Sequence, residues 1–562
     1  MENIYSKYAH KTQILFLVSF AIAFLYRYQS VPQLSVGREM WAESGTNYYY
    51  FARIAGIWEN LKATDSGYLP IVPRLVALGT QFLNIPLQYI PRVYQLVGFL
   101  FISFCTASFV LPVFGQVLQD EKKRFVLSLA LLFIWDYELL TFINFSYYAM
   151  IPLFFVCLIP NFDKIRFWKV ALSACAIALV VPSKAFYLAF FPVLGLRAGF
   201  GLIQKRWKET LFFGLPSISL ALSAILILQN AQSMQKGKSE LPFVDFLAGT
   251  SLRSAELIAE HLFGRLLKGA EGLTQLIIIA FACLIILLIF FRYKTQLRML
   301  FSHQKNLLIL LPTILVALAT VAIKVKYDST PVTIADLKFN RLMDNRQWFS
   351  ANIALFSGLS LILLQLPFKK QLSAYGAFGF LLLFSNYARF RLKPVIVEWP
   401  IHEYSNWRAF VPVLKRTEAE GWCVPLNPYP WFFSYNCNYL SSPPPAKELV
   451  TNQLISLQEK RKFELPAASR EKSFLLIGLP LRETTCKKLR LDFLSPTGES
   501  VGIAKILEPR GQVLSFFIAE KPPASASQFE INSEDVLCSP EKMGKIVQQK
   551  SEPQPLAIWM GR

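Results

Sequence analysis

The chain has 562 residues, of which 54% are hydrophobic, and its mean hydropathy is +0.38. Soluble globular domains are less apolar, so this composition argues against a soluble protein and favours a membrane bundle with room for one further domain. The formal net charge is +21. The basic residues occupy short segments between apolar runs, as membrane topology requires, so the charge does not indicate a nucleic-acid partner.

A membrane-spanning helix needs roughly 17–25 mostly apolar residues, and about eleven stretches approach or reach that length. They lie at 12–27, 93–115, 124–139, 146–161, 167–182, 185–201, 210–229, 272–291, 306–324, 347–366 and 371–390. The chain is therefore predicted to be an α-helical polytopic membrane protein.

The segments between these stretches alternate in character. Short basic segments, such as Lys122-Lys123-Arg124, alternate with three longer segments of mixed charge at 28–92, 230–271 and 325–346. By the positive-inside rule the basic segments are cytoplasmic and the mixed segments lie outside. An odd number of spans then places the N-terminus in the cytoplasm and the residues after 390 on the outer side.

The first outer segment, 28–92, is about 60 residues long, which is far more than a connection between two spans needs. Phe51, Ile54, Trp58 and Leu61 recur at helical spacing, so the stretch 46–62 is predicted to be an amphipathic helix on the membrane surface. A second amphipathic stretch is predicted at 74–84.

The composition changes sharply near residue 390, which predicts a transmembrane domain over 1–390 and an outer domain over 391–562. The part 391–445 is predicted to be α/β, with a helix-like stretch at 405–420 and four tryptophans that either bind glycan by stacking or pack in a core. These are Trp399, Trp407, Trp422 and Trp431.

A proline-rich break at 441–445 precedes a mainly β part, 446–562. A helix is predicted at 446–463, followed by strands and a turn at Pro496-Thr497-Gly498, which together suggest a β-sandwich-like module. The predicted strands are Phe474–Leu479, Leu489–Leu494, Val501–Leu507, Val513–Ala519 and Leu556–Met560.

The eight cysteines form two groups. Four lie in apolar runs and are predicted to be small core residues: Cys105, Cys157, Cys175 and Cys283. Four lie in the outer domain and permit three disulfide pairings. The pairing Cys423–Cys437 with Cys486–Cys538 is favoured, and an oxidising compartment such as the periplasm suits it.

Two motifs stand in the first outer segment. The first is Trp41-x-Glu43-x-Gly45, and the second is Gly67-Tyr68-Leu69 followed by Pro73-Arg74-Leu75. Together they resemble the GT-C superfamily of polytopic glycosyltransferases, in particular bacterial members that use polyprenyl-phosphate sugars. The resemblance covers residues 1–100 best, and the rest matches in layout. Ser44 departs from the pattern, because it stands where a second acid is expected.

The resemblance implies transfer of a hexosyl or pentosyl group from a polyprenyl-phosphate donor to a glycan, lipid or protein acceptor of the cell envelope. The reaction inverts the anomeric centre and takes place at the outer face of the inner membrane. Glu43 is the expected base, since a carboxylate takes the proton of the attacking hydroxyl. Arg74 is the expected phosphate ligand. Arg346 is a second one, because similar proteins carry an arginine–aromatic pair at this point.

Further substrate-binding residues are predicted from their place at the outer face. Acids at membrane depth are costly and suggest function, which singles out Asp136 and Glu138. Asn144, with its neighbours Tyr147 and Tyr148, is suited to sugar contacts. Lys184 occupies a tight outer turn, and Tyr68 belongs to the second motif.

Each of these residues also has a plain structural interpretation: a solvated loop carboxylate for Glu43, a snorkelling arginine for Arg74, and a lysine bound to lipid headgroups for Lys184. Arg253, Glu256, Glu260 and Arg265 are interpreted as ion pairs on a solvated helix. No paired-histidine metal motif is present, and the choice between no cofactor and a Mg²⁺ or Mn²⁺ ion held by carboxylates stays open.

Two other functions stay open beside glycosyl transfer. The first is a transporter or flippase of a lipid or sugar, and the second is an assembly protein whose catalytic residues have decayed. Transporters tend to carry inverted repeats with sites near the membrane midplane. This chain shows no such repeat, and its polar candidates gather at one face, which favours chemistry at the surface.

Overall fold

The computed structural model describes residues 2–30, 40–41, 43–65, 67–134, 138–163, 165–234, 241–267, 304–328, 332, 346–365, 407, 424–425, 432–433, 462–464, 474–479, 489–504, 515–519, 525–533 and 557–561. The chain divides into two compact units. The first unit comprises Met1–Ser35, Gly56–Val76 and Gln95–Val395, and the second comprises Val36–Ala55, Ala77–Tyr94 and Ile396–Arg562.

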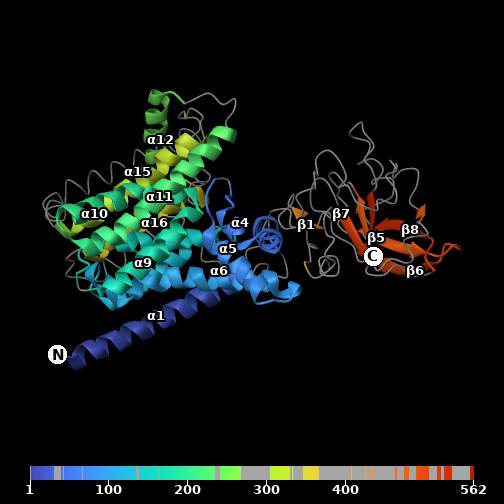
Figure 1. The fold of residues 1–562 in the computed structure, drawn as a ribbon, viewed down its shortest axis with the longest axis horizontal. Helices are drawn as coiled ribbons and strands as arrows, with labels where there is room; N and C mark the ends of the chain where they lie inside the picture. The colour runs from blue at the N-terminus through green and yellow to red at the C-terminus, as the bar shows by residue number, and fades with distance from the viewer. Residues whose placement is uncertain are drawn as a thin grey trace. The chain divides into compact units, whose positions relative to one another are not determined.

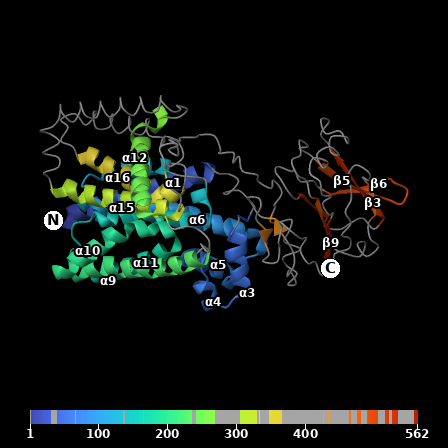
Figure 2. The ribbon, with the colours of Figure 1, turned by 90° about the horizontal axis from the view of Figure 1, so that it is seen from above.

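The first unit is a helical bundle (Figure 1). Its described helices are α1 (Glu2–Ser30), α4 (Ile57–Lys62), α7 (Glu121–Ala130), α8 (Met150–Cys157), α9 (Phe167–Val180), α10 (Phe191–Ile203), α11 (Trp207–Met234), α12 (Phe243–Leu267), α15 (Gln304–Asp328) and α16 (Phe349–Gln365). Helices α5 (Ile71–Phe82) and α6 (Ile90–Ala107) run through both units. Helix α11 packs against α9 and α10, and α15 packs against α16 and α12 (Figure 2).

Helical segments cover most of the described residues of the predicted spans. Among the described residues, four segments are long and apolar enough to cross a membrane: Leu87–Gln116, Ala185–Ile203, Trp207–Gln229 and Leu307–Lys326. Three apolar segments are shorter: Ile71–Phe82, Phe145–Cys157 and Phe167–Ser183. The predicted spans 272–291 and 371–390 lie outside the described residues, so the total of eleven spans stays a prediction.

The bundle turns apolar side chains outward. On α1, Leu17 and Leu25 are 61% and 63% exposed, whereas Ser19 is buried and its hydroxyl lies 3.1 Å from that of Ser128 on α7. The same holds for α9, α11 and α15, where the exposed residues include Leu172, Leu179, Leu222, Leu228, Leu311 and Leu318. In water a helix turns its apolar face to the core. The reverse arrangement suits a lipid environment, in which small and polar residues mediate helix packing.

The cysteines in the bundle differ in burial. Cys105 and Cys157 are buried, as predicted, and Cys283 lies outside the described residues. The prediction for Cys175 is wrong, because this residue is exposed on α9. Helix α9 directs Val170 and Ala174 into the bundle, and Cys175 follows one position later, which turns it about 100° away from that face.

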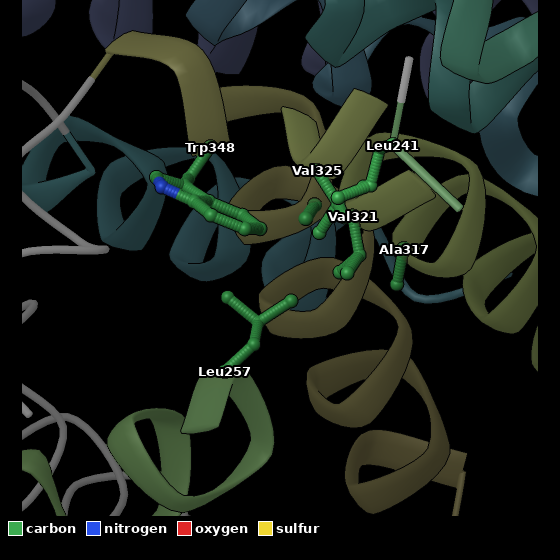
Figure 3. Close-up of a cluster of buried hydrophobic side chains, with 7 residues drawn as sticks. Leu241, Leu257, Ala317, Val321, Val325 and Trp348 are labelled. Carbon is green, nitrogen blue, oxygen red and sulfur yellow. The ribbon is translucent and has the colours of Figure 1, made fainter. Parts of the chain in front are cut away.

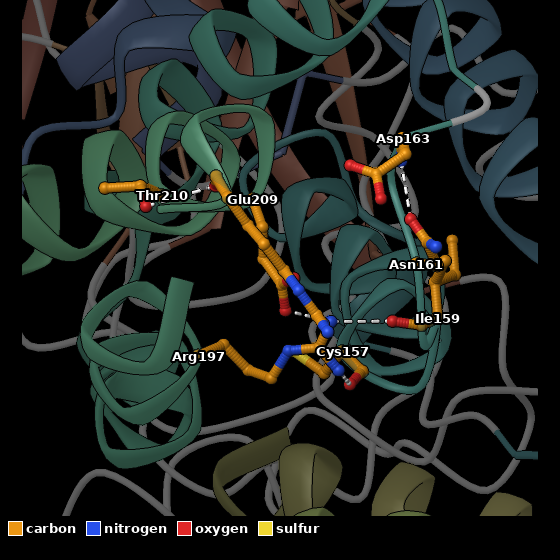
Figure 4. Close-up of polar contacts among 8 residues, drawn as sticks. Cys157, Ile159, Asn161, Asp163, Arg197, Glu209 and Thr210 are labelled. Carbon is orange, nitrogen blue, oxygen red and sulfur yellow. Dashed lines mark hydrogen bonds and ion pairs between the residues drawn. The ribbon is translucent and has the colours of Figure 1, made fainter. Parts of the chain in front are cut away.

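An ion pair between α10 and α11, which also contacts the end of α8, joins these three helices (Figure 4). The Arg197 guanidinium of α10 lies 2.5 Å from the carboxylate of Glu209, which stands in the first turn of α11. The same guanidinium donates to the backbone carbonyls of Ile159 at 2.7 Å and Cys157 at 3.4 Å, at the end of α8. Because helix ends leave carbonyls without intrahelical partners, Arg197 satisfies two groups that burial makes costly.

Replacing Gly358 with alanine is expected to destabilise the contact between α15 and α16. A Cβ at Gly358 would lie 2.2 Å from Oγ1 and 3.0 Å from Cβ of Thr313, so the two helices must separate. Overpacking of this kind typically costs about 1–3 kcal/mol. The matched control is Gly195→Ala, since nothing lies within 4 Å of that added methyl group. Unfolding in detergent should show a lower stability for Gly358→Ala only; equal stabilities would contradict the close packing.

The second unit contains antiparallel sheets. One sheet has the order β3-β8-β5-β6, a second has the order β7-β4-β9, and β1 pairs with β2. The strands are β1 (Val424–Pro425), β2 (Phe432–Phe433), β3 (Lys462–Glu464), β4 (Phe474–Leu479), β5 (Leu489–Leu494), β6 (Ser500–Ala504), β7 (Ser515–Ala519), β8 (Gln528–Ser533) and β9 (Ala557–Gly561). The buried Phe493 and Phe529 face each other in the register of β5 and β8.

All five predicted strand stretches contain strands, and the turn at 496–498 is present. Gly498 adopts φ +86°, which suits glycine, and its amide donates to the carbonyl of Ser495. The predicted helix 446–463 is wrong at its end, because Lys462–Glu464 pairs with β8 as a strand; the rest of that helix lies outside the described residues.

Candidate functional site

The segment 46–62 is not the single helix that was predicted there. A π-helical turn at Ser44–Tyr50 leads into α3 (Phe51–Ile54). The helical structure is then interrupted at Gly56, and α4 begins at Ile57. The break has a local cause, since the Glu59 carboxylate accepts a hydrogen bond of 2.8 Å from the Gly56 amide and caps α4. Ile57 and Trp58 of α4 are 66% and 73% exposed, so α4 presents exposed apolar side chains.

Glu43 begins the π-helical turn in the second unit. It occupies the N-cap position and is half-buried. π-Helical turns are rare and often mark functional sites. The next residue, Ser44, is 1% exposed, and its hydroxyl has no hydrogen-bond partner among the described residues. An acid at this position would place a charge in a buried environment, which is energetically costly. Burial therefore explains why an uncharged serine stands here.

The π-helical turn that follows Glu43 packs against aromatic residues of the same unit. The Tyr49 ring packs edge-on against Trp407 with centroids 5.3 Å apart. The Trp407 indole donates to the carbonyl of Leu87 at 2.6 Å and is 1% exposed. Burial raises the pKa of the Tyr49 phenol, and Arg53 opposes this shift. Trp407 is therefore a core residue rather than a glycan platform; Trp399, Trp422 and Trp431 lie outside the described residues.

The second motif forms a tight turn in the first unit. Asp65 and Tyr68 exchange backbone hydrogen bonds of 2.8 and 3.1 Å, and Gly67 between them adopts φ +87°, a conformation that favours glycine. The next amide, that of Leu69, donates to the carbonyl of Pro182 at 2.9 Å. The motif is thus attached to the turn that carries Lys184, although 116 residues separate Tyr68 from Lys184.

Lys184 lies between two tyrosines. Its ammonium is 4.7 Å from the ring centroid of Tyr68 and 5.7 Å from that of Tyr147, and it donates to the Tyr68 hydroxyl at 3.3 Å. The residue is only 5% exposed. Cation–π contacts stabilise a cation more strongly when it is desolvated. Lys184 is therefore a buried, oriented positive charge rather than a mobile surface lysine.

Arg74 is also buried. It stands in the first turn of α5 and is 1% exposed, so it does not snorkel to a membrane surface. Buried arginines require compensation by hydrogen bonds or opposite charge. Arg74 and Lys184 are thus two buried positive charges of the first unit.

Glu138 and Arg346 form an ion pair of 2.8 Å, with side chains that are 20% and 39% exposed. Glu138 stands in the 3₁₀ turn η6 (Glu138–Leu140), and Arg346 opens the 3₁₀ turn η11 (Arg346–Trp348) before α16. Asn144 is buried and donates to the Glu138 carbonyl at 3.0 Å, while Thr141 donates to it at 2.6 Å. Asn144 thus shapes the turn that presents Glu138.

Sequence reasoning missed Arg27, at the end of α1. This arginine is fully buried, donates to the carbonyl of Leu132 at 2.7 Å, and lies 5.6 Å from the Tyr148 ring. The neighbouring Tyr147 contacts Lys184, and both tyrosines pack on Phe349, which directly follows η11. The sequence shows Arg27 at the end of the apolar stretch 12–27. That position alone does not distinguish a buried arginine from one at the surface.

The structure therefore brings together four predicted residues in the first unit. Tyr68 meets Lys184, and Glu138 meets Arg346; the segment 138–149 connects the two pairs through Tyr147. Glu43 belongs to the second unit, so its approach to these cations stays a prediction. Asp136 and the four cysteines of the C-terminal part (Cys423, Cys437, Cys486 and Cys538) lie outside the described residues.

The chemistry of this cluster suits an anion. The buried ammonium of Lys184 favours phosphate or carboxylate oxygens, and the hydroxyls of the two tyrosines beside it add neutral donors. Within the described ranges no group of three or more His, Cys, Asp or Glu side chains is placed to hold a metal ion. The choice between no cofactor and a Mg²⁺ or Mn²⁺ ion stays open. No protein-family model, no curated protein and no solved structure matches the chain.

Proposed function

We propose that the protein is a membrane glycosyltransferase that moves a sugar from a polyprenyl-phosphate carrier to an acceptor of the cell envelope. The observation that carries this proposal is Lys184, a nearly buried ammonium held between Tyr68 and Tyr147 and attached to the Gly67-Tyr68-Leu69 motif. A buried, oriented cation stabilises an anion more strongly than one in water, because the surrounding dielectric is low.

The proposed reaction needs few groups. An acceptor hydroxyl attacks the anomeric carbon of the donor sugar and forms the new glycosidic bond. The bond from that carbon to the carrier phosphate breaks, and the phosphate leaves with the electron pair. Glu43 takes the proton of the hydroxyl, and Lys184 stabilises the departing phosphate. Arg74 and Arg346 supply further positive charge, since a guanidinium binds phosphate oxygens in a bidentate way.

The outward apolar faces of the bundle support a lipid-linked donor. The long apolar segments and the exposed Ile57 and Trp58 of α4 suit a protein held in a bilayer with α4 at the interface. In such an arrangement the carrier chain stays in lipid while its phosphate reaches the cations. The inner membrane of a bacterium, with the second unit in the periplasm, is the proposed location.

Glu43→Ala is expected to abolish sugar transfer while the protein still inserts into the membrane, because no other proposed group takes the proton. Cells that lack the gene are complemented with the wild type, with Glu43→Ala, or with Glu499→Ala, which changes an exposed carboxylate of the same unit. The sugar content of envelope lipids and glycans is then compared by mass spectrometry. We expect the modification with the wild type and Glu499→Ala only. Undiminished transfer by Glu43→Ala would show that Glu43 is not the base.

A further inference from the structure

The turn that presents Arg346 is attached to a buried apolar cluster. Trp348, at the other end of η11, is 3% exposed and packs with side chains of α12, α15 and α16. The cluster consists of Leu241, Leu257, Ala317, Val321, Val325, Trp348 and Ala351. Figure 3 shows Leu257 of α12 beneath the Trp348 ring, with Val321 and Val325 of α15 to the right of that ring. Helix α12 thus reaches the turn through Leu257.

Two further contacts fix the turn on its other sides. Phe349, the next residue, packs on Tyr147 and Tyr148 with ring centroids 6.4 and 5.2 Å apart. The hydroxyl of Ser350 lies 2.8 Å from that of Thr320 on α15. A 3₁₀ turn has three residues per turn, so a fixed Trp348 leaves the backbone of Arg346 little freedom. To pair with Glu138, Arg346 then has to restrict only its own side-chain rotamers and not its backbone.

Helix α12 is itself held against the bundle. Arg253 and Glu256 form an ion pair of 2.5 Å, and Glu256 is 1% exposed, so the prediction of a solvated helix face is wrong here. A carboxylate is buried only where a partner compensates its charge, and Arg253 provides this. Glu256 directly precedes Leu257. At Gly249 the helix comes close to α15, since an added Cβ would lie 3.2 Å from Val325.

We propose that Leu257 of α12 is a positioning residue for Arg346, and that it acts through Trp348. Partly exposed ion pairs contribute little when both side chains must be ordered for the contact. A turn that is ordered in advance removes part of that cost, so the Arg346–Glu138 pair should be strong only while α12 is packed against Trp348. This role goes beyond the proposed reaction, because it concerns the order of the cation whatever anion it meets.

The test is a double-mutant cycle of Arg346→Met and Glu138→Gln, measured by unfolding of the purified full chain in detergent. The cycle isolates the interaction between the two side chains. It is repeated in the Leu257→Ala background and in Leu220→Ala, a matched control at a fully buried leucine of α11. Leu257→Val provides a milder change if the alanine variant does not fold.

We expect the interaction to change the unfolding equilibrium by about 2- to 5-fold in the wild type and in Leu220→Ala. It should vanish in Leu257→Ala and shrink in Leu257→Val. An interaction that persists in both Leu257 variants overturns the proposal, and so does an equal loss in Leu220→Ala, which would indicate general softening. Since no sugar is transferred in this measurement, its result is independent of the proposed function.

Discussion

Arg197→Met is expected to lower the free energy of unfolding by about 3–5 kcal/mol, the cost of removing one partner of a buried ion pair. The Glu209 side chain is only 6% exposed. Without Arg197, its one remaining ion-pair partner among the described residues would be Arg206, at 3.7 Å. The carbonyls of Cys157 and Ile159 would also lose a charged donor. The effect combines a buried charge with two helix-end groups, so it should exceed that of an ordinary core substitution.

The control is Lys11→Met. Lys11 also pairs with a glutamate, Glu121, at 2.6 Å, but its side chain is 50% exposed. Exposed pairs contribute less than about 1 kcal/mol, so this variant should unfold close to the wild type. Both variants are compared by denaturant unfolding in the same detergent. Similar stabilities of Arg197→Met and Lys11→Met would contradict the assignment of the Arg197–Glu209 pair as the junction of α8, α10 and α11.

Lys184→Met is expected to weaken binding of polyprenyl phosphate by about 10- to 100-fold, the usual worth of a hydrogen bond to a charged group. Methionine keeps an apolar chain between the tyrosine rings, so the fold should survive while the positive charge is lost. The measurement is titration of the protein in lipid nanodiscs with polyprenyl phosphate, and its readout is the dissociation constant.

Lys169→Met is the matched control for this loss of charge. Lys169 also lies over an aromatic ring, with its ammonium 5.4 Å from the centroid of Trp168, but it is exposed on α9. Its replacement should leave binding unchanged. If both variants bound the lipid equally, the phosphate site would not include Lys184.

Periodicity and turn chemistry predicted much of this fold. The strand ends at Phe474–Leu479 and Leu489–Leu494 coincide with β4 and β5, because a short apolar stretch between turn residues leaves the chain little alternative. The prediction of one helix over 46–62 is wrong at Gly56. There the Glu59 carboxylate caps a new helix, and this local hydrogen bond outweighs the helical spacing of the apolar residues. Local hydrogen bonds to side chains of this kind are weak signals in a sequence.

The candidate site was predictable as a set of residues but not as an arrangement. Tyr68 and Lys184 were both singled out, yet their contact depends on the hydrogen bond from Leu69 to Pro182, which joins distant segments. The spacing of Arg253 and Glu256 predicted their ion pair, but not that Glu256 is buried. Arg27 and Trp348 were not assigned to the site, since burial is a tertiary property that a single sequence does not report.

The most direct test of the proposed function separates covalent transfer from transport. The purified protein is reconstituted in liposomes with a polyprenyl-phosphate sugar, radiolabelled in the sugar, together with envelope extract as the source of acceptor. We predict that the label leaves the lipid and becomes covalently attached to an acceptor, and that Glu43→Ala prevents this. Label that crosses the bilayer while still joined to its lipid would contradict the account and identify a flippase.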